Sequence, residues 1–296
     1  MTLPFNPRLV LIGGQWRAGS SGQTLPLMNP SDGKLLAEIA RGTAADIDAA
    51  VAAAQAALDG RWGQLTAAER GRILLKMSAL TLARADELAR LEALDVGKPL
   101  RQGRADAVAM ARYLEFYGGA ADTVHGETIP FAKGYTALTL REPQGVTGHI
   151  VPWNYPMQII GRSVGAALAM GNACVLKPAE EAGAALSCHP GVAHLSFTGS
   201  VAVGPMIQAA AAMNTIPVTL ELGGKARRSC LPMPMPMPTW TWPWPWPWPW
   251  PCPSWSMPAS RTAAMIGQGD SGRSDVASNV KREVYDALLE KHGLAR

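Results

Sequence analysis

GVTGHIVPWNYPMQIIGRSVGAALAMGNACVLKPAE, residues 145–180, contains the pattern that decides the fold. A β-rich run, GVTGHIV, is followed by the helical stretch PMQIIGRSVGAALAM and by a second β-rich run, NACVLK. Further along the chain come VAHLSFT, the helical stretch VAVGPMIQAAAAM and PVTLEL. Strands that alternate with helices predict an α/β fold with a mostly parallel sheet, in which ligands bind at the carboxyl ends of the strands.

The chain before this stretch is predicted to be mainly helical. Thr43 is placed to cap TAADIDAAVAAAQAAL, and Thr66 with Glu69 has the spacing of a capping box. The sequence GKP at 97–99 interrupts the pattern, and RADAVAMARYLEFY predicts a further helix. TALTLRE, residues 136–142, then alternates like a strand.

Composition sets the broad class of the protein. The 296 residues are 48% hydrophobic and 17% charged, enough for one large or two modest domains with cores. A net charge of +4 without a basic block argues against a nucleic-acid partner. The first residues lack the features of a signal peptide, and no run of 18 apolar residues follows. We therefore expect a cytoplasmic protein with no membrane partner.

Four motifs fall at the ends of the predicted strands: VPWNYP at 151–156, KPAE at 177–180, FTGSVAVG at 197–204 and LELGGK at 220–225. In this order they resemble the NAD(P)-dependent aldehyde dehydrogenase superfamily, and the resemblance extends back to about Leu11. It implies N-terminal helices followed by a Rossmann-type, mostly parallel sheet. It also implies oxidation of a small-molecule aldehyde to a carboxylic acid with NAD(P)+ through a cysteine thioester.

The resemblance gives two residues catalytic roles. Asn154 corresponds to the oxyanion donor, because a side-chain amide stabilises a tetrahedral intermediate without titrating. Glu221 corresponds to the general base that activates water for thioester hydrolysis. Plain structural alternatives stay open: an asparagine that satisfies the turn before Pro156, and a strand-end glutamate with no catalytic role.

A second group of residues is implied in cofactor binding. Lys177 and Glu180 correspond to the pair that brackets the adenosine ribose, where a carboxylate favours NAD and leaves NADP as the alternative. The turn in FTGSVAVG corresponds to the pyrophosphate contact. The alternatives are a solvated surface pair, an ordinary glycine-bounded turn and, for Trp153, a buried core aromatic. The full set is Ile150, Trp153, Lys177, Glu180, Gly199, Ser200, Gly204 and Leu222.

The nucleophilic cysteine that this chemistry needs cannot be assigned, although the aldehyde must form a thiohemiacetal before it gives up hydride. In the family it lies in a G-Q-x-C context, whereas GQGD at 267–270 has Asp270 in that place. We therefore expect no appreciable turnover. None of the five histidines has a partner at a spacing that suggests a site, and no metal site is expected. The cysteines are Cys174 and Cys188, both expected to be structural, Cys230, too close to Glu221, and Cys252, which lies between two prolines.

Residues 226–279 break the pattern with Met-Pro and Pro-Trp repeats. Codons ATG-CCN and CCN-TGG, read two bases later, give Ala-Asp and Ala-Leu or Ala-Val repeats, the kind of sequence that the family shows after its general base. Our hypothesis is a frameshift from about Ala226 to about Val280. The prolines predict that this segment forms no compact domain. The alternative function is a non-enzymatic damaged fragment with weak nucleotide binding and a Trp/Pro-rich interaction tail in a polyproline II conformation.

The expected organisation has three parts. Residues 1–225 contain the N-terminal helices and the NAD(P)-binding α/β domain, 226–279 the aberrant segment, and 280–296 a remnant helix of the catalytic domain. After KPAE the family continues through a further helix and strand, so an in-frame deletion of roughly thirty residues is expected near 180–181. The catalytic domain is otherwise expected to be missing or garbled. The particular aldehyde therefore cannot be read, and the homo-oligomeric assembly of the family stays open for this chain.

Overall fold

A four-stranded parallel sheet forms the centre of the computed structural model, which describes residues 5–178 and 183–223. Its strands lie in the order β10-β9-β7-β8 and all run in the same direction. The predicted parallel sheet is confirmed, and the strands end within two residues of the expected positions. Their bounds are Val146–Ile150 for β7, Ala173–Lys177 for β8, His194–Ser200 for β9 and Val218–Gly223 for β10.

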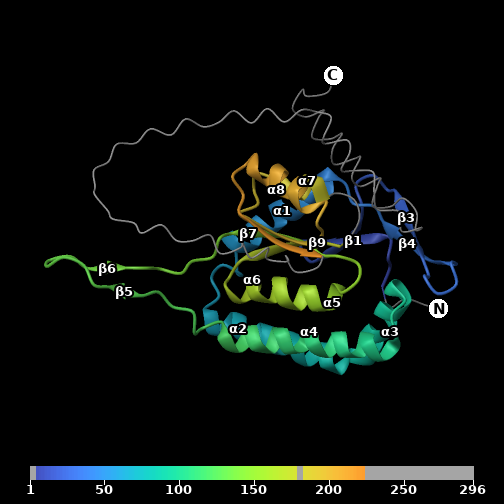
Figure 1. Ribbon diagram of the computed structural model, residues 1–296, viewed down its shortest axis with the longest axis horizontal. Helices are drawn as coiled ribbons and strands as arrows, with labels where there is room; N and C mark the ends of the chain where they lie inside the picture. Colours follow the sequence, from blue (N-terminus) through green and yellow to red (C-terminus); the bar gives the residue numbers. More distant parts are fainter. Residues whose placement is uncertain (1–4, 179–182, 224–296) are drawn as a thin grey trace, which may run out of the picture. The chain divides into compact units, whose positions relative to one another are not determined.

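The connecting helices cover both faces of the sheet. β8 lies on one side of β7, and β9 and then β10 lie on the other, so right-handed crossovers place the helix after β7 on one face and the helices after β8 and β9 on the other. Figure 1 shows this arrangement, with α7 and α8 above the sheet and α5 and α6 below it. The bounds are Pro156–Ile159 for α5, Ile160–Val164 for a π-helical turn (η1), Gly165–Ala169 for α6, Gly183–Ser187 for α7 and Gly204–Ala212 for α8.

The N-terminal helices match the predicted pattern. In the capping box of α2, the Thr66 amide donates to Glu69 Oε2 at 2.8 Å and the Glu69 amide donates to Thr66 Oγ1 at 3.3 Å. Gly97 ends α3 in the left-handed region, with φ of 75°, which a glycine adopts without strain. The helix predicted from 104 begins four residues earlier. The bounds are Ala44–Asp59 for α1, Ala67–Ala83 for α2, Ala85–Val96 for α3 and Leu100–Ala120 for α4.

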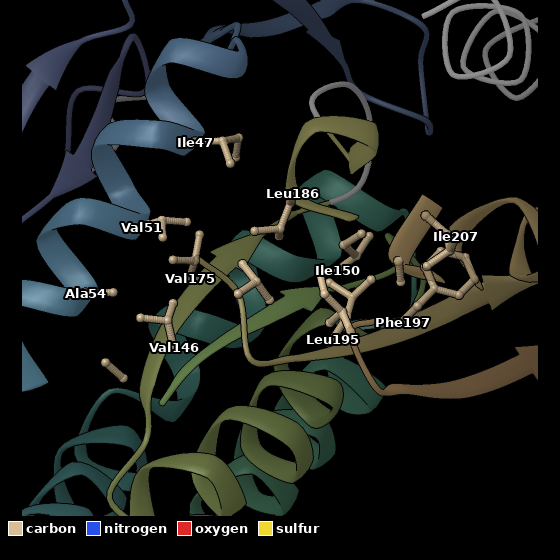
Figure 2. Close-up of a cluster of buried hydrophobic side chains, with 14 residues drawn as sticks. Ile47, Val51, Ala54, Val146, Ile150, Val175, Leu186, Leu195, Phe197 and Ile207 are labelled. Carbon is tan, nitrogen blue, oxygen red and sulfur yellow. The ribbon is translucent and has the colours of Figure 1, made fainter. Parts of the chain in front are cut away.

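An apolar cluster fills the space between the sheet and α1, α7 and α8 (Figure 2). The sheet contributes alternate residues, among them Val146, Val175 and Leu195, and α1 contributes Ile47 and Val51. On the other side, α4 packs against α2 and α3 and also against α5 and α6. The α5–α6 segment therefore lies between the sheet and the helices α2 and α4, as Figure 1 shows, whereas α1 packs on the opposite face.

Two parts of the N-terminal half differ from expectation. Four short strands form antiparallel hairpins that the sequence did not predict: β1 (Leu9–Ile12) with β2 (Gln15–Ala18), and β3 (Thr24–Met28) with β4 (Leu35–Ala40). The strand predicted over 136–142 is wrong in extent. Only β6 (Ala137–Leu138) forms there, paired with β5 (Thr128–Ile129), because the large side chains of this hairpin stay exposed and find no apolar layer among the described residues.

Several predictions fall outside the described residues: Glu180, the junction at 180–181, and everything from 226 onward. Within the described part of the chain, no helix combines the length and apolar composition needed to cross a bilayer. The cytoplasmic location stays a prediction.

Candidate functional site

The four sequence motifs meet at one edge of the sheet. Ile150 is opposite Lys177 on β8 and Phe197 on β9, and Thr198 on β9 is opposite Glu221 on β10. Because the strands are parallel and neighbouring, the segments that follow them emerge on the same side. The register thus brings together the motifs at 151–156, 177–178, 197–204 and 220–223.

The loop after β7 presents its polar residues to solvent. Its first amide, on Val151, donates to the Lys177 carbonyl at 3.0 Å, which ties the loop to the end of β8. Trp153 is 64% exposed, so the alternative of a buried core aromatic is wrong. Asn154 is exposed as well, and Pro156 occupies the first turn of α5, where its missing amide costs no hydrogen bond.

Two residues implied in cofactor binding are buried. Lys177 is only 8% exposed, so the alternative of a solvated surface pair does not hold for this side chain. Ile150 belongs to the apolar cluster between the sheet and α1, and it contacts the same layer as Leu186 and Phe197. The side chain of Ile150 therefore packs in the apolar cluster, and only its backbone lies at the carboxyl edge of the sheet.

The turn into α8 needs glycine because of close packing and not because of a left-handed backbone conformation. Neither Gly199 nor Gly204 has a positive φ. A Cβ on Gly204 would lie 2.7 Å from the Leu222 side chain, and one on Gly199 would lie 2.4 Å from the Phe197 ring. Close packing therefore excludes larger residues. None of the side chains that the structure describes caps the first turn of α8, and Ser200 is exposed, which is the arrangement that helix N-termini offer to anions.

The sheet face opposite the apolar cluster is polar, which the sequence analysis missed. Alternation along β7, β9 and β10 places hydroxyl, imidazole and carboxylate groups on this face. They line a cavity of about 360 Å³ together with residues of the α5–α6 segment. Buried parallel strands are usually apolar throughout. Polar residues at every second position of these strands were therefore the signal in the sequence that could have predicted the polar face. The sheet residues in this lining are Thr147, His149, His194, Ser196, Thr198, Thr219 and Glu221.

His149 is the most buried ionisable group of this polar face, at 3% exposure. The Thr147 hydroxyl donates to the Ala173 carbonyl at 3.2 Å and lies 3.0 Å from His149 Nε2, so Nε2 is the protonated nitrogen and donates to Thr147. Nδ1 is left as an acceptor without a hydrogen-bond partner among the described residues. Burial lowers the pKa of His149 from 6.5 to about 4, and the charge of the nearby His194 adds to this. His149 is therefore neutral at pH 7.

The two described cysteines are poor nucleophile candidates. Burial raises the pKa of Cys174 to about 11, against a smaller opposite effect of its contact with Thr147. Cys174 lies on β8, three strand spacings of about 4.8 Å from Glu221 on β10. Cys188 follows α7, and its Sγ lies 3.9 Å from the Ala185 carbonyl oxygen. Cys230 and Cys252 lie outside the described residues, as does Asp270. No group of His, Cys, Asp and Glu able to hold a metal occurs within 5–178 and 183–223.

This architecture is that of α/β proteins that bind ligands across the carboxyl edge of a parallel sheet. A model of the "Aldehyde dehydrogenase family" matches the chain over residues 16–184 and 180–230. The chain belongs to the aldehyde dehydrogenase family. The fold class and the family expected from the sequence are both confirmed.

Relatives and solved structures agree with this family. Hydroxyisobutyraldehyde dehydrogenase of Mycolicibacterium austroafricanum is 40% identical over 252 residues, covering 74% of this chain and 50% of the relative. Benzaldehyde dehydrogenase of Antirrhinum majus is 40% identical over 251 residues, covering 73% and 47%. A putative aldehyde dehydrogenase from Burkholderia cenocepacia is 56% identical with a TM-score of 0.71, covering 72% of this chain and 52% of that chain. The chain spans about half the length of these proteins.

The expected cofactor is that of the family, which is NAD(P)-dependent. One of the similar solved structures is PnpE in complex with nicotinamide adenine dinucleotide, at 36% identity and a TM-score of 0.72, covering 75% of this chain and 52% of that chain.

Proposed function

We propose that this chain is the cofactor-binding half of an NAD(P)-dependent aldehyde dehydrogenase and that it does not oxidise aldehydes by itself. The observation that carries the proposal is the convergence of four family motifs at one sheet edge that has no reactive thiol beside it among the described residues. In this proposal Asn154 is the oxyanion donor and Glu221 the general base. Both act on a thioester, which needs a cysteine thiolate.

The described residues fit a dinucleotide. Lys177 offers a buried amine at the end of β8, and the uncapped first turn of α8, with Ser200, offers donors to a pyrophosphate. Leu222 packs against Gly204 and so holds that turn close to β10. Bound NAD(P) would supply the hydride acceptor, and the described residues would bind and orient it.

Three observations support a deletion near 180–181. The family model matches in two pieces, 16–184 and 180–230, which overlap at 180–184. The alignment to the Mycolicibacterium relative spans 252 residues, although 74% of this chain amounts to only about 219. Finally, β8 is an edge strand in the described sheet, with β7 as its only neighbour. We propose that roughly thirty residues, one strand and its helix, are missing beside β8. The loss should weaken cofactor binding, because the contacts to the ribose must be held to within about half an ångström.

The substrate in this proposal is a small-molecule aldehyde of unspecified identity. The frameshift hypothesis concerns residues 226–279, which follow the proposed base, Glu221. DNA of the source locus tests it, because an uninterrupted reading frame with no insertion or deletion near these codons would contradict a frameshift.

Equilibrium titration of the purified full chain with NAD+ tests the proposed site. We expect measurable but weak binding that Lys177→Met and Ser200→Ala each reduce, the former by about tenfold or more, equivalent to about 1.4 kcal/mol. Lys133→Met removes the same charge from an exposed position away from the sheet and should leave the affinity unchanged. Thermal unfolding of each variant establishes that it is folded. Absence of binding by the folded chain, or an affinity of Lys177→Met and Ser200→Ala equal to that of the unsubstituted chain, overturns the assignment.

A further inference from the structure

A buried charge cluster lies where α3 ends and α4 begins, apart from the polar sheet face. Lys98 Nζ is 2.6 Å from Asp106 Oδ2 and 3.2 Å from Glu92 Oε1. The three side chains are 10%, 0% and 2% exposed, respectively. One ammonium group therefore serves two carboxylates from two different helices in a nearly dry environment.

The cluster reaches the loop that carries Asn154 through two further contacts. Asp106 Oδ1 accepts a hydrogen bond from Gln158 Nε2 of α5 at 2.6 Å. Lys98 Nζ lies 4.3 Å from the centroid of the Tyr155 ring, within the range of a cation–π interaction. Tyr155 is the N-cap residue of α5 and directly follows Asn154. Lys98 thus contacts the ring of Tyr155, the last residue of the loop, and Asp106 contacts the helix after the loop through Gln158.

Such a cluster is expensive to bury, which argues that it has a geometric role. Isolated buried charges are strongly unfavourable, and a buried ion pair often stabilises a fold no better than apolar residues do. Glu92 Oε2 has no hydrogen-bond partner among the described residues. Burial raises the pKa of Glu92, and the contacts of Lys98 offset this only in part. For Asp106, burial acts to raise the pKa, but the hydrogen bonds from Lys98, Gln158 and Gln102 outweigh it and the pKa is lowered.

We propose that Lys98 is a positioning residue for the loop 151–155: by holding the Tyr155 ring and, through Asp106, Gln158 of α5, it sets the direction in which the Asn154 side chain is presented. The inference rests on the proposed role of Asn154 for its functional meaning. The mechanical link itself is a property of the described residues. Lys98 touches no reacting atom in this account and acts only through Tyr155 and α5.

The direct test follows the Tyr155 ring in the full chain. Incorporation of 3-fluorotyrosine gives one 19F resonance for each of the five tyrosines, and Tyr155→Phe assigns the one of interest. Lys98→Met keeps most of the side-chain volume but removes the cation over the ring. We expect the Tyr155 resonance to shift and broaden, while those of Tyr113 and Tyr117 in α4 stay in place. Lys98→Arg, which keeps the charge, should restore most of the original signal.

A matched control separates positioning from general weakening of the helix pair. Arg104 and Asp86 also link α4 to α3, at 2.8 Å, but both side chains are exposed. Arg104→Met removes this ion pair and should leave the Tyr155 resonance unchanged. Hydrogen exchange gives a second readout: amides of 151–155 should exchange about tenfold faster in Lys98→Met, whereas amides of β7 and β9 should not change, as expected for loss of a contact of about 1.4 kcal/mol.

The outcomes are decisive in either direction. An unchanged Tyr155 resonance and unchanged loop exchange in folded Lys98→Met overturn the proposal, and so does an equal response in Arg104→Met. If Lys98→Met does not fold, Gln158→Leu tests the same link from α5: faster exchange of the loop supports the proposal, and unchanged exchange contradicts it. None of these readouts involves NAD+, so a failure of cofactor binding leaves the result on positioning intact.

Discussion

The environment of His149 is a feature of the site that could not be predicted from the sequence. In GVTGHIV it is a polar residue in a β-rich run, two residues after Thr147 and with no acidic or second histidine residue beside it in the run. The fold places it near His194 of the neighbouring strand, with its Nε2 donating to Thr147 and its Nδ1 without a hydrogen-bond partner in the described part of the chain. The proximity of His194 depends on the register between β7 and β9, and register is a long-range property.

The environment of His149 predicts a dependence of folding stability on pH. The pKa is 6.5 in the unfolded chain and about 4 in the folded protein, so the native state favours the neutral ring. The stabilising contribution is fully present above pH 6.5 and is lost as the pH falls toward 4. A shift of this size corresponds to about 3 kcal/mol.

His149→Gln should remove most of this loss, since glutamine keeps a donor for Thr147 but does not titrate. Urea unfolding at pH 7 and pH 4.5 measures the difference in the free energy of unfolding. We expect a smaller drop between these two pH values in His149→Gln than in the unsubstituted chain. The same drop in both proteins would show that His149 is already protonated, or not buried, in the native state.

For other residues of the site, the sequence predicted the position in the fold but not the physical reason for the residue type. The motif FTGSVAVG placed Gly199 and Gly204 correctly at the end of a strand and the start of a helix. The need for glycine comes from the Phe197 ring and the Leu222 side chain, which lie close to the two backbones. Leu222 comes from another strand, so the contact has no local signature in the motif.

Among the elements, helices with a strong apolar period and a recognisable cap were predicted well. α1 and α2 begin within one residue of the expected caps, because the cap and the first apolar turn are encoded within a few residues. The hairpins of residues 9–40 were missed, since strands of only four to six residues leave a weak pattern.

The capping box of α2 predicts a measurable contribution to stability. Thr66→Ala removes the acceptor for the Glu69 amide and leaves the Glu69 carboxylate without the Thr66 hydroxyl, which donates to it at 2.8 Å. We expect a loss of about 1 kcal/mol in the free energy of unfolding, measured by urea denaturation. Lys76→Ala, on an exposed position of the same helix, should change stability by less than about 0.5 kcal/mol. Equal effects of the two substitutions would contradict a specific role of the cap.

For the molecule as a whole, the sequence predicted the parallel sheet and the family, because strands alternate with helices and the four motifs follow one another in the order of the family. It could not predict the strand order, the polar sheet face or the link from Lys98 to Tyr155. Each of these depends on residues far apart in sequence that meet only in the folded chain. The proposed site combines both kinds of information, since Asn154 and Glu221 come from motifs and their convergence comes from the sheet.

We propose that the chain keeps the cofactor half of an aldehyde dehydrogenase, and the described residues contain no reactive thiol on which Asn154 and Glu221 would act. Removing the nucleophile from a catalytic unit leaves only a small residual rate from its partners. Burial holds the pKa of Cys174 near 11, so this thiol stays protonated at neutral pH.

Aldehyde-dependent formation of NADH by the purified chain tests this claim most directly. The rate should be compared with that of a version in which the reading frame from 226 to 279 is restored and with a blank without aldehyde. We predict no NADH above the blank for the chain as it stands. A rate comparable to that of the restored version would contradict the account and identify Cys230 or Cys252 as a working nucleophile, which replacement of each by alanine would then distinguish.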